Sequence, residues 1–304
     1  MGDQRGKIVN RKPIALIGGI AALVALFFVA IFWPMWQQGE QLTPIIQEKM
    51  VRYSFTLENQ TNQALEQVAF KAFAPVSSTP FQQVERIETS VPHQLETDEL
   101  GNQTLAFNLQ QFPPYGQKTI SISVWLKTAD LPAFESTLKP EDALQPLVDK
   151  NDQYLIDAVG RIDSNRDQDQ WLRSANQWVH DTLEDVGYVA EDRGAQYALQ
   201  ERKGDCTEFA HALIAMGRSK DIPALLVAGF PVPGGNSILQ ASDYHNWVLA
   251  NAEDRWRVAD PHAGEFETGA ERYIAFRVSN EGKTVSSYSQ KFFSYDQRVE
   301  VRMN

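Results

Sequence analysis

Between residues 51 and 125, apolar and polar residues alternate with a period of two. The run from residue 119 to residue 125 shows this most clearly, since every second residue in it is apolar. Such alternation is typical of β-strands that bury one face. Turn signals at residues 98–102 and 113–116 separate the runs. We therefore expect about six short strands over roughly 80 residues, the pattern of a small β-sandwich.

The period changes after a proline-punctuated stretch at residues 132–146. Residues 154–162 and 171–183 carry apolar side chains at steps of three and four, so each is expected to form a helix. A third helix is expected from Cys206, because Ala210, Leu213, Ile214 and Gly217 recur at the same steps and define one face.

A β-hairpin is expected later in the chain. Residues 247–249 and 256–258 are strand-prone, and residues 251–254 between them read as a turn. The paired ends of an antiparallel hairpin lie side by side, so His245 before the first strand should meet Asp260 after the second. The preceding loop, at 231–242, is expected to be flexible and to line or gate a cleft, while the residues at 291–303 should add a late strand.

The N-terminal segment differs from the rest of the chain. Residues 14–36 carry no charge, which is long enough to cross a hydrocarbon core of about 30 Å. Four basic residues precede them, and basic residues favour the cytoplasmic side. We expect a single-pass helix at residues 13–36 in the inner (plasma) membrane, with residues 1–12 cytoplasmic and the remainder periplasmic or extracellular. The alternative is a cleaved signal peptide.

The composition of the chain argues against some classes of binding partner. The 304 residues carry a formal net charge of -11, which argues against nucleic acid and against docking on an anionic lipid surface. The chain has one cysteine, so its thiol has no internal disulfide partner and stays available for chemistry. No cofactor is expected.

That cysteine, Cys206, is the leading candidate for a nucleophile. Gly204 and Asp205 read as turn and cap residues, which would place Cys206 in the first turn of its helix. Unpaired N–H groups and the helix dipole favour a thiolate there. A nucleophilic thiol also needs a base and a group that orients the base, roles that His245 and Asp260 could fill.

Other interpretations of these residues stay open. A cysteine at a helix start is often a small buried apolar residue. Cys206, His245, Asp260 and His262 are also possible zinc ligands, although neither Cys-x-x-Cys nor His-x-x-x-His spacing supports a metal site. The oxygen-rich stretch at 163–169 has the look of a calcium loop, but Gln168 and Ser174 replace its turn glycine and bidentate glutamate. We interpret that stretch as a loop and N-cap.

The motifs taken together resemble a known family. They are Gly-Asp-Cys-Thr-Glu-Phe-Ala at 204–210, the His-x-Trp strand at 245–247 and the Trp-x-x-x-Asp-Pro strand at 256–261. In this order they resemble the bacterial transglutaminase-like domains, over roughly residues 150–280. The resemblance implies a papain-like α+β fold with Cys206 as nucleophile, His245 as base and Asp260 as orienting residue. Known activities in the family are peptide hydrolysis, amide cross-linking and deamidation, and some members have lost catalysis.

The chain departs from the family pattern at two places. Asn246 stands where alanine is more frequent, and Asp-Pro is followed by His262, an uncommon continuation. Neither departure removes a member of the triad. His93, His180, His211 and His262 have no assigned chemistry.

These observations predict an α+β protein in several parts. Residues 37–130 are expected to hold a tether, which includes the short polar stretch at 42–50, and an immunoglobulin-like β-sandwich. A linker is expected at 131–150 and a papain/transglutaminase-like domain at 151–304. The expected function is cleavage or transfer at an amide bond of a peptide or protein in the cell envelope, by a cysteine hydrolase, peptidase or acyltransferase. The alternative is a non-catalytic scaffold, and in either case the sandwich is expected to space the domain or contact an envelope partner.

Overall fold

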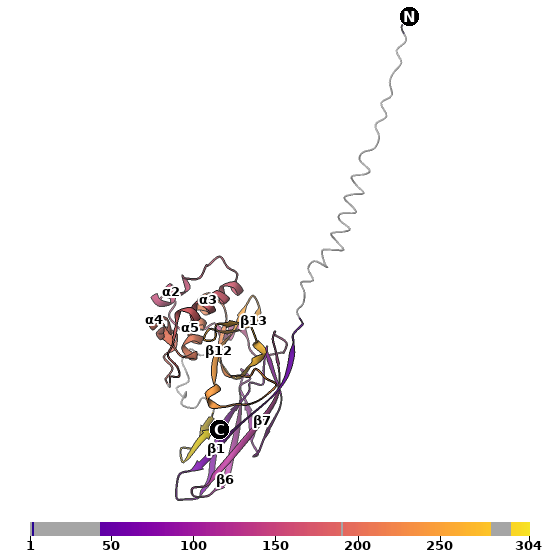
Figure 1. Cartoon of the computed structure of the whole chain (residues 1–304), viewed down its shortest axis with the longest axis vertical. Helices are drawn as coiled ribbons and strands as arrows, with labels where there is room; N and C mark the ends of the chain where they lie inside the picture. The colour runs from indigo at the N-terminus through magenta and orange to yellow at the C-terminus, as the bar shows by residue number, and fades with distance from the viewer. Residues whose placement is uncertain (1, 3–42, 190, 281–292) are drawn as a thin grey trace. The chain divides into compact units, whose positions relative to one another are not determined.

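The computed structural model describes residues 2, 43–189, 191–280 and 293–304. The membrane helix predicted at residues 13–36 lies outside these ranges. Among the helices of the described residues, none is long and apolar enough to cross a membrane. Residues 44–304 form one compact unit, which contains all the strands and helices shown in colour in Figure 1.

Two β-sheets make up the N-terminal part of this unit. The larger has the strand order β11-β1-β7-β4-β3, with β17 also paired to β1, and the smaller has the order β16-β2-β6-β5. Their strands are β1 (Ile46–Asn59), β2 (Leu65–Ala74), β3 (Ser78–Thr79), β4 (Gln82–Thr89), β5 (Gln94–Thr97), β6 (Gln103–Phe112), β7 (Gln117–Ala129), β11 (Asn236–Ile238), β16 (Phe293–Tyr295) and β17 (Val299–Met303).

The alternation in the sequence corresponds to the burial of one face of these strands. In β7, for example, Ile120, Ile122 and Val124 are fully buried while their neighbours are partly exposed. Side chains from both sheets share one core, in which the rings of Phe55 and Phe70 meet edge to face at 5.2 Å. The predicted β-sheets before the second half are therefore present, and the immunoglobulin-like character stays a prediction.

β1 is longer than the sequence pattern indicates. A tether was expected to run through residues 42–50, but the strand begins at Ile46 and pairs with β7 over its length. Main-chain hydrogen bonds hold this first stretch, and they form whatever the polarity of the side chains. Gln47, Glu48 and Lys49 are all polar, so the sequence shows no alternation there that would predict a strand.

The second half packs helices against one face of a five-stranded sheet (Figure 1). The sheet has the order β14-β13-β12-β10-β15 and is antiparallel where adjacent strands pair. Its strands are β10 (Ala224–Pro231), β12 (His245–Ala252), β13 (Arg255–Asp260), β14 (Glu265–Phe266) and β15 (Tyr273–Ser279). The helices are α2 (Gln153–Val159), α3 (Gln168–Thr182), α4 (Gly194–Glu201) and α5 (Cys206–Ser219).

Short elements connect these layers. They are the two-residue strands β8 (Glu184–Asp185) and β9 (Lys203–Gly204), which pair with each other in parallel, and the 3-10 turns η1 (Pro140–Ala143), η2 (Ala241–Asp243) and η3 (Ala270–Arg272). The predicted helices at 154–162 and 171–183 correspond to α2 and α3 with shifted ends. Asp167 caps α3 by accepting a hydrogen bond from the backbone of Gln170, as its interpretation as an N-cap predicts.

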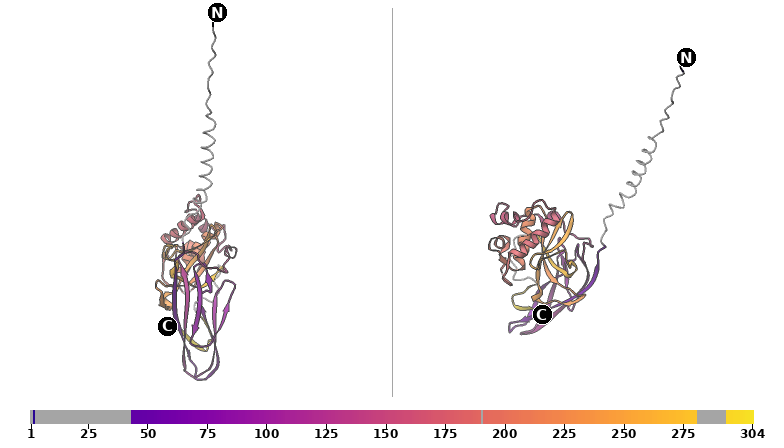
Figure 2. Two further views of the ribbon diagram at one scale, coloured as in Figure 1. Left: turned by 90° about the vertical axis from the view of Figure 1, so that its right-hand side faces the viewer. Right: turned by 45° about the horizontal axis from the view of Figure 1, so that its top comes forward.

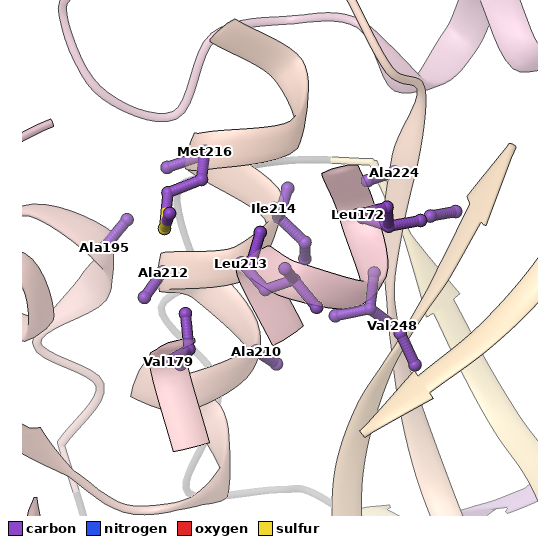
Figure 3. Close-up of a cluster of buried hydrophobic side chains, with 14 of the residues drawn as sticks. Leu172, Val179, Ala195, Ala210, Ala212, Leu213, Ile214, Met216, Ala224 and Val248 are labelled. Carbon is purple, nitrogen blue, oxygen red and sulfur yellow. The ribbon is translucent and has the colours of Figure 1, made fainter. Parts of the chain in front are cut away.

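α5 lies at the centre of this half. Figure 3 shows Leu213 and Ile214 of α5 among Leu172 of α3 and Val248 of β12. The sequence predicted one apolar face, but every residue of α5 from Thr207 to Arg218 is buried. A helix surrounded by partners on all sides has no solvated face.

The two halves share strands as well as a core. β11 runs parallel to β1, with Met50 opposite Asn236, and lies inside the loop 231–242 that was expected to be flexible. The buried Lys49 ammonium donates hydrogen bonds to the carbonyl oxygens of Val232 at 2.6 Å and Gly234 at 3.2 Å. Main-chain pairing and this cation attach this part of the loop to the first strand, and its flexibility stays a prediction.

The C-terminal residues cross back to the N-terminal sheets. β17 pairs antiparallel with β1, and β16 pairs with β2. The side chain of Gln82 also bonds both the N–H and the carbonyl of Ala275 in β15. The two views of Figure 2 show the yellow C-terminal strands beside the indigo and magenta strands of these sheets. The C-terminal strands therefore cross back to the first sheets within one compact unit. The predicted division into domains at residues 130 and 151 stays a prediction.

We expect Lys49→Met to destabilise the protein by about 1–3 kcal/mol, because the carbonyls of Val232 and Gly234 lose a charged donor in a buried place. Chemical denaturation would measure the change in the free energy of unfolding. Lys118→Met, on an exposed position of the neighbouring strand β7, is the matched control. Equal effects of the two substitutions would show that Lys49 does not hold the loop.

Candidate active site

Cys206 is the first residue of α5, as the cap signals predict. The carboxylate of Asp205 accepts a hydrogen bond from the backbone N–H of Thr207 at 2.8 Å. The carboxylate of Glu208 accepts one from the N–H of Asp205 at 3.0 Å. This reciprocal capping box satisfies two of the N–H groups that a helix start leaves unpaired. The thiol is thereby held on a fixed helical turn, and the side chain is partly exposed.

The Glu208 carboxylate also binds the chain that precedes α4. One of its oxygens accepts from the backbone N–H of Arg193 at 2.8 Å, and the other lies 3.1 Å from the Arg193 guanidinium. Glu208 is fully buried, and a buried carboxylate is tolerated only with such partners. The segment around Arg193 is therefore fixed to the turn that carries Cys206.

β12 and β13 form the expected hairpin and bring His245 to Asp260. The distance from His245 Nε2 to Asp260 Oδ2 is 2.6 Å. Asp260 is 1% exposed, and its other oxygen accepts hydrogen bonds from the backbone N–H groups of His262 at 3.1 Å and Ala263 at 3.0 Å. The Tyr273 hydroxyl donates to Oδ2 at 2.8 Å. Asp260 therefore has four donors around a carboxylate that water does not reach.

The site raises the pKa of His245 and lowers the pKa of Asp260. Burial by itself would lower the pKa of His245, but hydrogen bonds with Asp260 and with the Cys206 thiol outweigh it and raise the pKa to about 10. Burial would raise the pKa of Asp260, but the bonds from His245, Ala263 and Tyr273 outweigh it and hold the pKa below its usual range. Burial and the neighbouring Asp260 charge raise the pKa of Tyr273, which keeps its hydroxyl a donor. An imidazolium at His245 faces an ionised Asp260 at neutral pH.

Two residues that the sequence did not assign to the site connect its parts. Asn246 donates a hydrogen bond to the Thr207 hydroxyl at 2.8 Å, which joins the residue after His245 to the residue after Cys206. Both side chains are buried. The sequence marks Asn246 only as a departure from alanine, and that polar residue in a buried strand is the available signal. Tyr273 lies on β15, where nothing in the sequence links it to Asp260.

A cleft of about 550 Å³ opens beside these residues. Cys206 and His245 line it together with residues from four separate segments, namely Asp185, Gly187, Tyr188, Asp205, Ala241, Ser242, Tyr244 and His262. The volume is that of a small-molecule or peptide side-chain site. The predicted nucleophile and base therefore meet in one accessible cavity, while Asp260 lies behind them.

The remaining histidines divide into two groups. His180 lies close to the carbonyl oxygens of Pro261 and His262, each 3.2 Å from its Nδ1, so it supports the loop after Asp260. His211 is buried in α5, and His93 hydrogen-bonds the Thr89 hydroxyl. Only His262 lines the cleft, with its ring centroid 5.6 Å from that of His245. Within the described ranges, no three His, Cys, Asp or Glu side chains are placed to hold one metal ion.

Comparisons with known proteins agree with this architecture. Residues 158–261 match the profile of the Transglutaminase-like superfamily. The uncharacterized protein ML0607 of Mycobacterium leprae (strain TN) is 24% identical over 201 residues, which are 60% of this chain and 70% of the relative.

Two solved structures give the comparison in three dimensions. A candidate cysteine protease from Cytophaga hutchinsonii has a TM-score of 0.55 at 13% identity, over 86% of this chain and 91% of its own. The periplasmic domain of TgpA from Pseudomonas aeruginosa has a TM-score of 0.36 at 17% identity, over 70% of this chain and 88% of its own. The first of these likenesses supports the fold: an α+β protein in which β-sheets precede a transglutaminase-like core.

We expect Gly204→Ala to destabilise the protein by about 1–3 kcal/mol or more, because a Cβ there would lie 2.2 Å from Cβ of the buried Glu208. Thermal or chemical unfolding would measure the loss. Gly217→Ala, later in the same helix, is the control: its Cβ would make only ordinary contacts and should stabilise the helix by about 0.5–1 kcal/mol. A mild effect of Gly204→Ala would mean that the turn before Cys206 is not sterically fixed.

Proposed function

We propose that this protein is a thiol enzyme that cleaves or transfers an amide bond of a peptide or protein. The observation that carries the proposal is the arrangement around the cleft. A single cysteine at a capped helix start shares that cleft with a histidine whose partner is a buried, ionised aspartate. Nucleophile, base and orienting group are the three parts that acyl transfer through a thioester requires.

In the first half of the reaction the Cys206 sulfur attacks the amide carbonyl carbon. A C–S bond forms, and the electron pair of the C=O bond moves to oxygen. The backbone N–H of Cys206, at the start of α5, is one donor to this oxyanion. His245 then gives its proton to the amide nitrogen, the oxyanion re-forms the C=O bond as the C–N bond breaks, and the amine leaves a thioester on Cys206.

The second half releases the acyl group from sulfur. A water molecule or an amine attacks the thioester, and His245 takes the proton that this nucleophile loses. The C–S bond breaks and the sulfur regains its electron pair. Asp260 holds the imidazole ring in one orientation through both steps, and Tyr273 and the N–H groups of His262 and Ala263 keep Asp260 ionised.

A non-catalytic scaffold is the second candidate, since the family includes members that have lost catalysis. The intact set of Cys206 and His245 in an open cleft, with Asp260 behind them, favours the enzyme. A scaffold has no requirement for a buried carboxylate with four donors behind a solvent-reached imidazole. The reactivity of the thiol separates the two candidates.

We further propose that the protein acts in the cell envelope. The uncharged segment preceded by basic residues supports a single-pass anchor at residues 13–36 in the inner membrane, with the cleft on the far side. The substrate would then be an envelope peptide or protein, and the N-terminal β-sheets could contact an envelope partner.

Alkylation kinetics test the proposed roles. A protonated His245, with its pKa raised to about 10, places a positive charge beside the Cys206 sulfur across neutral pH. This effect disappears as the pH rises through about 10. An ordinary thiol is less than about one per cent ionised at pH 6. We therefore expect iodoacetamide to modify Cys206 at pH 6 at least about tenfold faster in the wild type than in His245→Ala.

The order of effects is also expected. Asp260→Asn should slow alkylation at pH 6 less than His245→Ala does, because it disturbs the orientation of the imidazole but leaves it in place. His93→Ala, in the connection between β4 and β5, is the control and should change nothing. If alkylation of Cys206 follows an ordinary thiol titration that His245→Ala does not alter, the cysteine is structural and the scaffold is the better description.

A reporter fusion tests the proposed membrane topology. A reporter that is active only outside the cytoplasm, fused after Asn304, should be active, because the segment at residues 13–36 would direct the rest of the chain across the membrane. The mature protein should retain residues 1–36 and sediment with membranes. A soluble product that starts after residue 30 would identify the segment as a signal peptide. A comparison of envelope proteins from cells with Cys206 or Cys206→Ala would then search for the altered peptide terminus or cross-link.

A further inference from the structure

The charged side chains that line the cleft beside Cys206 are mostly carboxylates. Its described lining contains two carboxylates, Asp185 and Asp205, and neither lysine nor arginine, while the protonated imidazole of His245 faces the Asp260 carboxylate. The oxygens of Asp205 accept hydrogen bonds from the backbone N–H groups of Thr207 and Val189, and the residue is buried. The Asp185 side chain is 54% exposed. The negative charge that a ligand can reach is therefore that of Asp185.

Asp185 is fixed relative to the nucleophile. It lies in β8 and pairs with Gly204, two residues before Cys206, while the N–H of Val186 donates to the Gly204 carbonyl at 3.0 Å. Its Oδ1 accepts from the N–H of Gly187 at 2.9 Å. These bonds hold the carboxylate in place, so a ligand group that binds it has a defined distance from the reacting sulfur.

The surroundings of Asp185 suit a cation. Tyr188 and Tyr244 line the same cleft from two separate segments, and aromatic rings attract ammonium and guanidinium groups. His262 Nε2 lies 3.2 Å from Asp185 Oδ2, so the neighbour of this carboxylate in the cleft is an imidazole rather than a lysine or an arginine. The formal net charge of -11 adds a field of the same sign over the whole chain.

We infer that the acyl part of the substrate carries a cationic side chain, an ammonium or a guanidinium, next to the bond that is attacked, and that Asp185 selects it. The inference rests on the proposed thiol chemistry and names the substrate class for the same cleft. An anionic group in that place would meet the charge of Asp185 without a lysine or arginine among the described lining residues to offset it. Selection of this kind acts on the acyl donor and leaves open whether water or an amine completes the reaction.

Matched peptide probes test the selection. Acetylated tripeptides ending in a vinyl sulfone, with lysine, norleucine or glutamate at either of the two positions next to the warhead, would compete for Cys206. Mass spectrometry would give the second-order rate of modification. We expect lysine to exceed norleucine by roughly threefold to tenfold at one position, with glutamate slowest and the ratio falling as salt is added.

Substitution of Asp185 provides the second part of this test. Asp185→Asn should reduce the lysine-to-norleucine ratio to about one, whereas Glu184→Gln, the adjacent exposed residue of β8 outside the cleft lining, should leave the ratio unchanged. Fluorescence anisotropy with the matching peptide amides and the Cys206→Ala protein repeats the comparison without any covalent step. It therefore reports the preference even if the thiol proves unreactive.

The outcomes separate the two proposals. A lysine-to-norleucine ratio near one in the wild type, or a preference for lysine that survives Asp185→Asn, would overturn the role of Asp185. The contact between Asp185 and His262 would then only support the loop after Asp260. Slow alkylation of Cys206 that ignores His245→Ala would overturn the thiol chemistry alone. A cation preference in the anisotropy assay would then identify the cleft as a binding site for cationic peptides.

Discussion

The buried carboxylate of Asp260 is the constraint on which the site depends. An ionised group at 1% exposure is stable only if donors replace the water it has lost. Those donors come from His245 on β12, Tyr273 on β15 and the loop after β13. Satisfying one carboxylate therefore draws three parts of the sheet together, and it leaves the imidazole of His245 with one edge toward Asp260 and the other available to Cys206.

The helix that carries Cys206 is connected to this sheet by bonds of the same kind. Asn246 and Thr207 join the strand to the helix one residue beyond each reacting side chain. Glu208 joins the helix start to Arg193 and to the N–H of Asp205. Buried polar networks are stable only when their members have partners, and such networks specify one arrangement strongly. Cys206 and His245 are thereby held by their immediate neighbours on both elements.

The N-terminal sheets contribute to the cleft as well as preceding it. β1 pairs with β7 and β17, and also with β11, from which the chain leads to Ala241, Ser242 and Tyr244 in the cleft wall. The other wall, from Asp185 to Tyr188, is held by β9 just before Cys206. The cleft is thus built between a loop attached to the first strand and a loop attached to the nucleophile. Its charge and width depend on both attachments.

The sequence by itself determined the parts of the site that depend on neighbours a few residues apart. The cap of α5 uses Asp205 and Glu208, three residues apart, and the meeting of His245 with Asp260 results from a hairpin with a short turn. Alternation likewise predicted the N-terminal strands. Local hydrogen bonds and periodicity leave a signature in the order of residues.

Only the tertiary structure decided the contacts between distant segments. The bond from Tyr273 to Asp260, the bridge from Asn246 to Thr207 and the pairing of β11 with β1 join elements that the sequence separates. β11 is three residues long, and its pairing uses main-chain groups that every residue except proline offers in full. Such contacts carry no side-chain signature, and packing alone brings their partners together. For the same reason the sequence named the nucleophile and its base, while the structure supplied the cleft and the carboxylate at Asp185 that faces it.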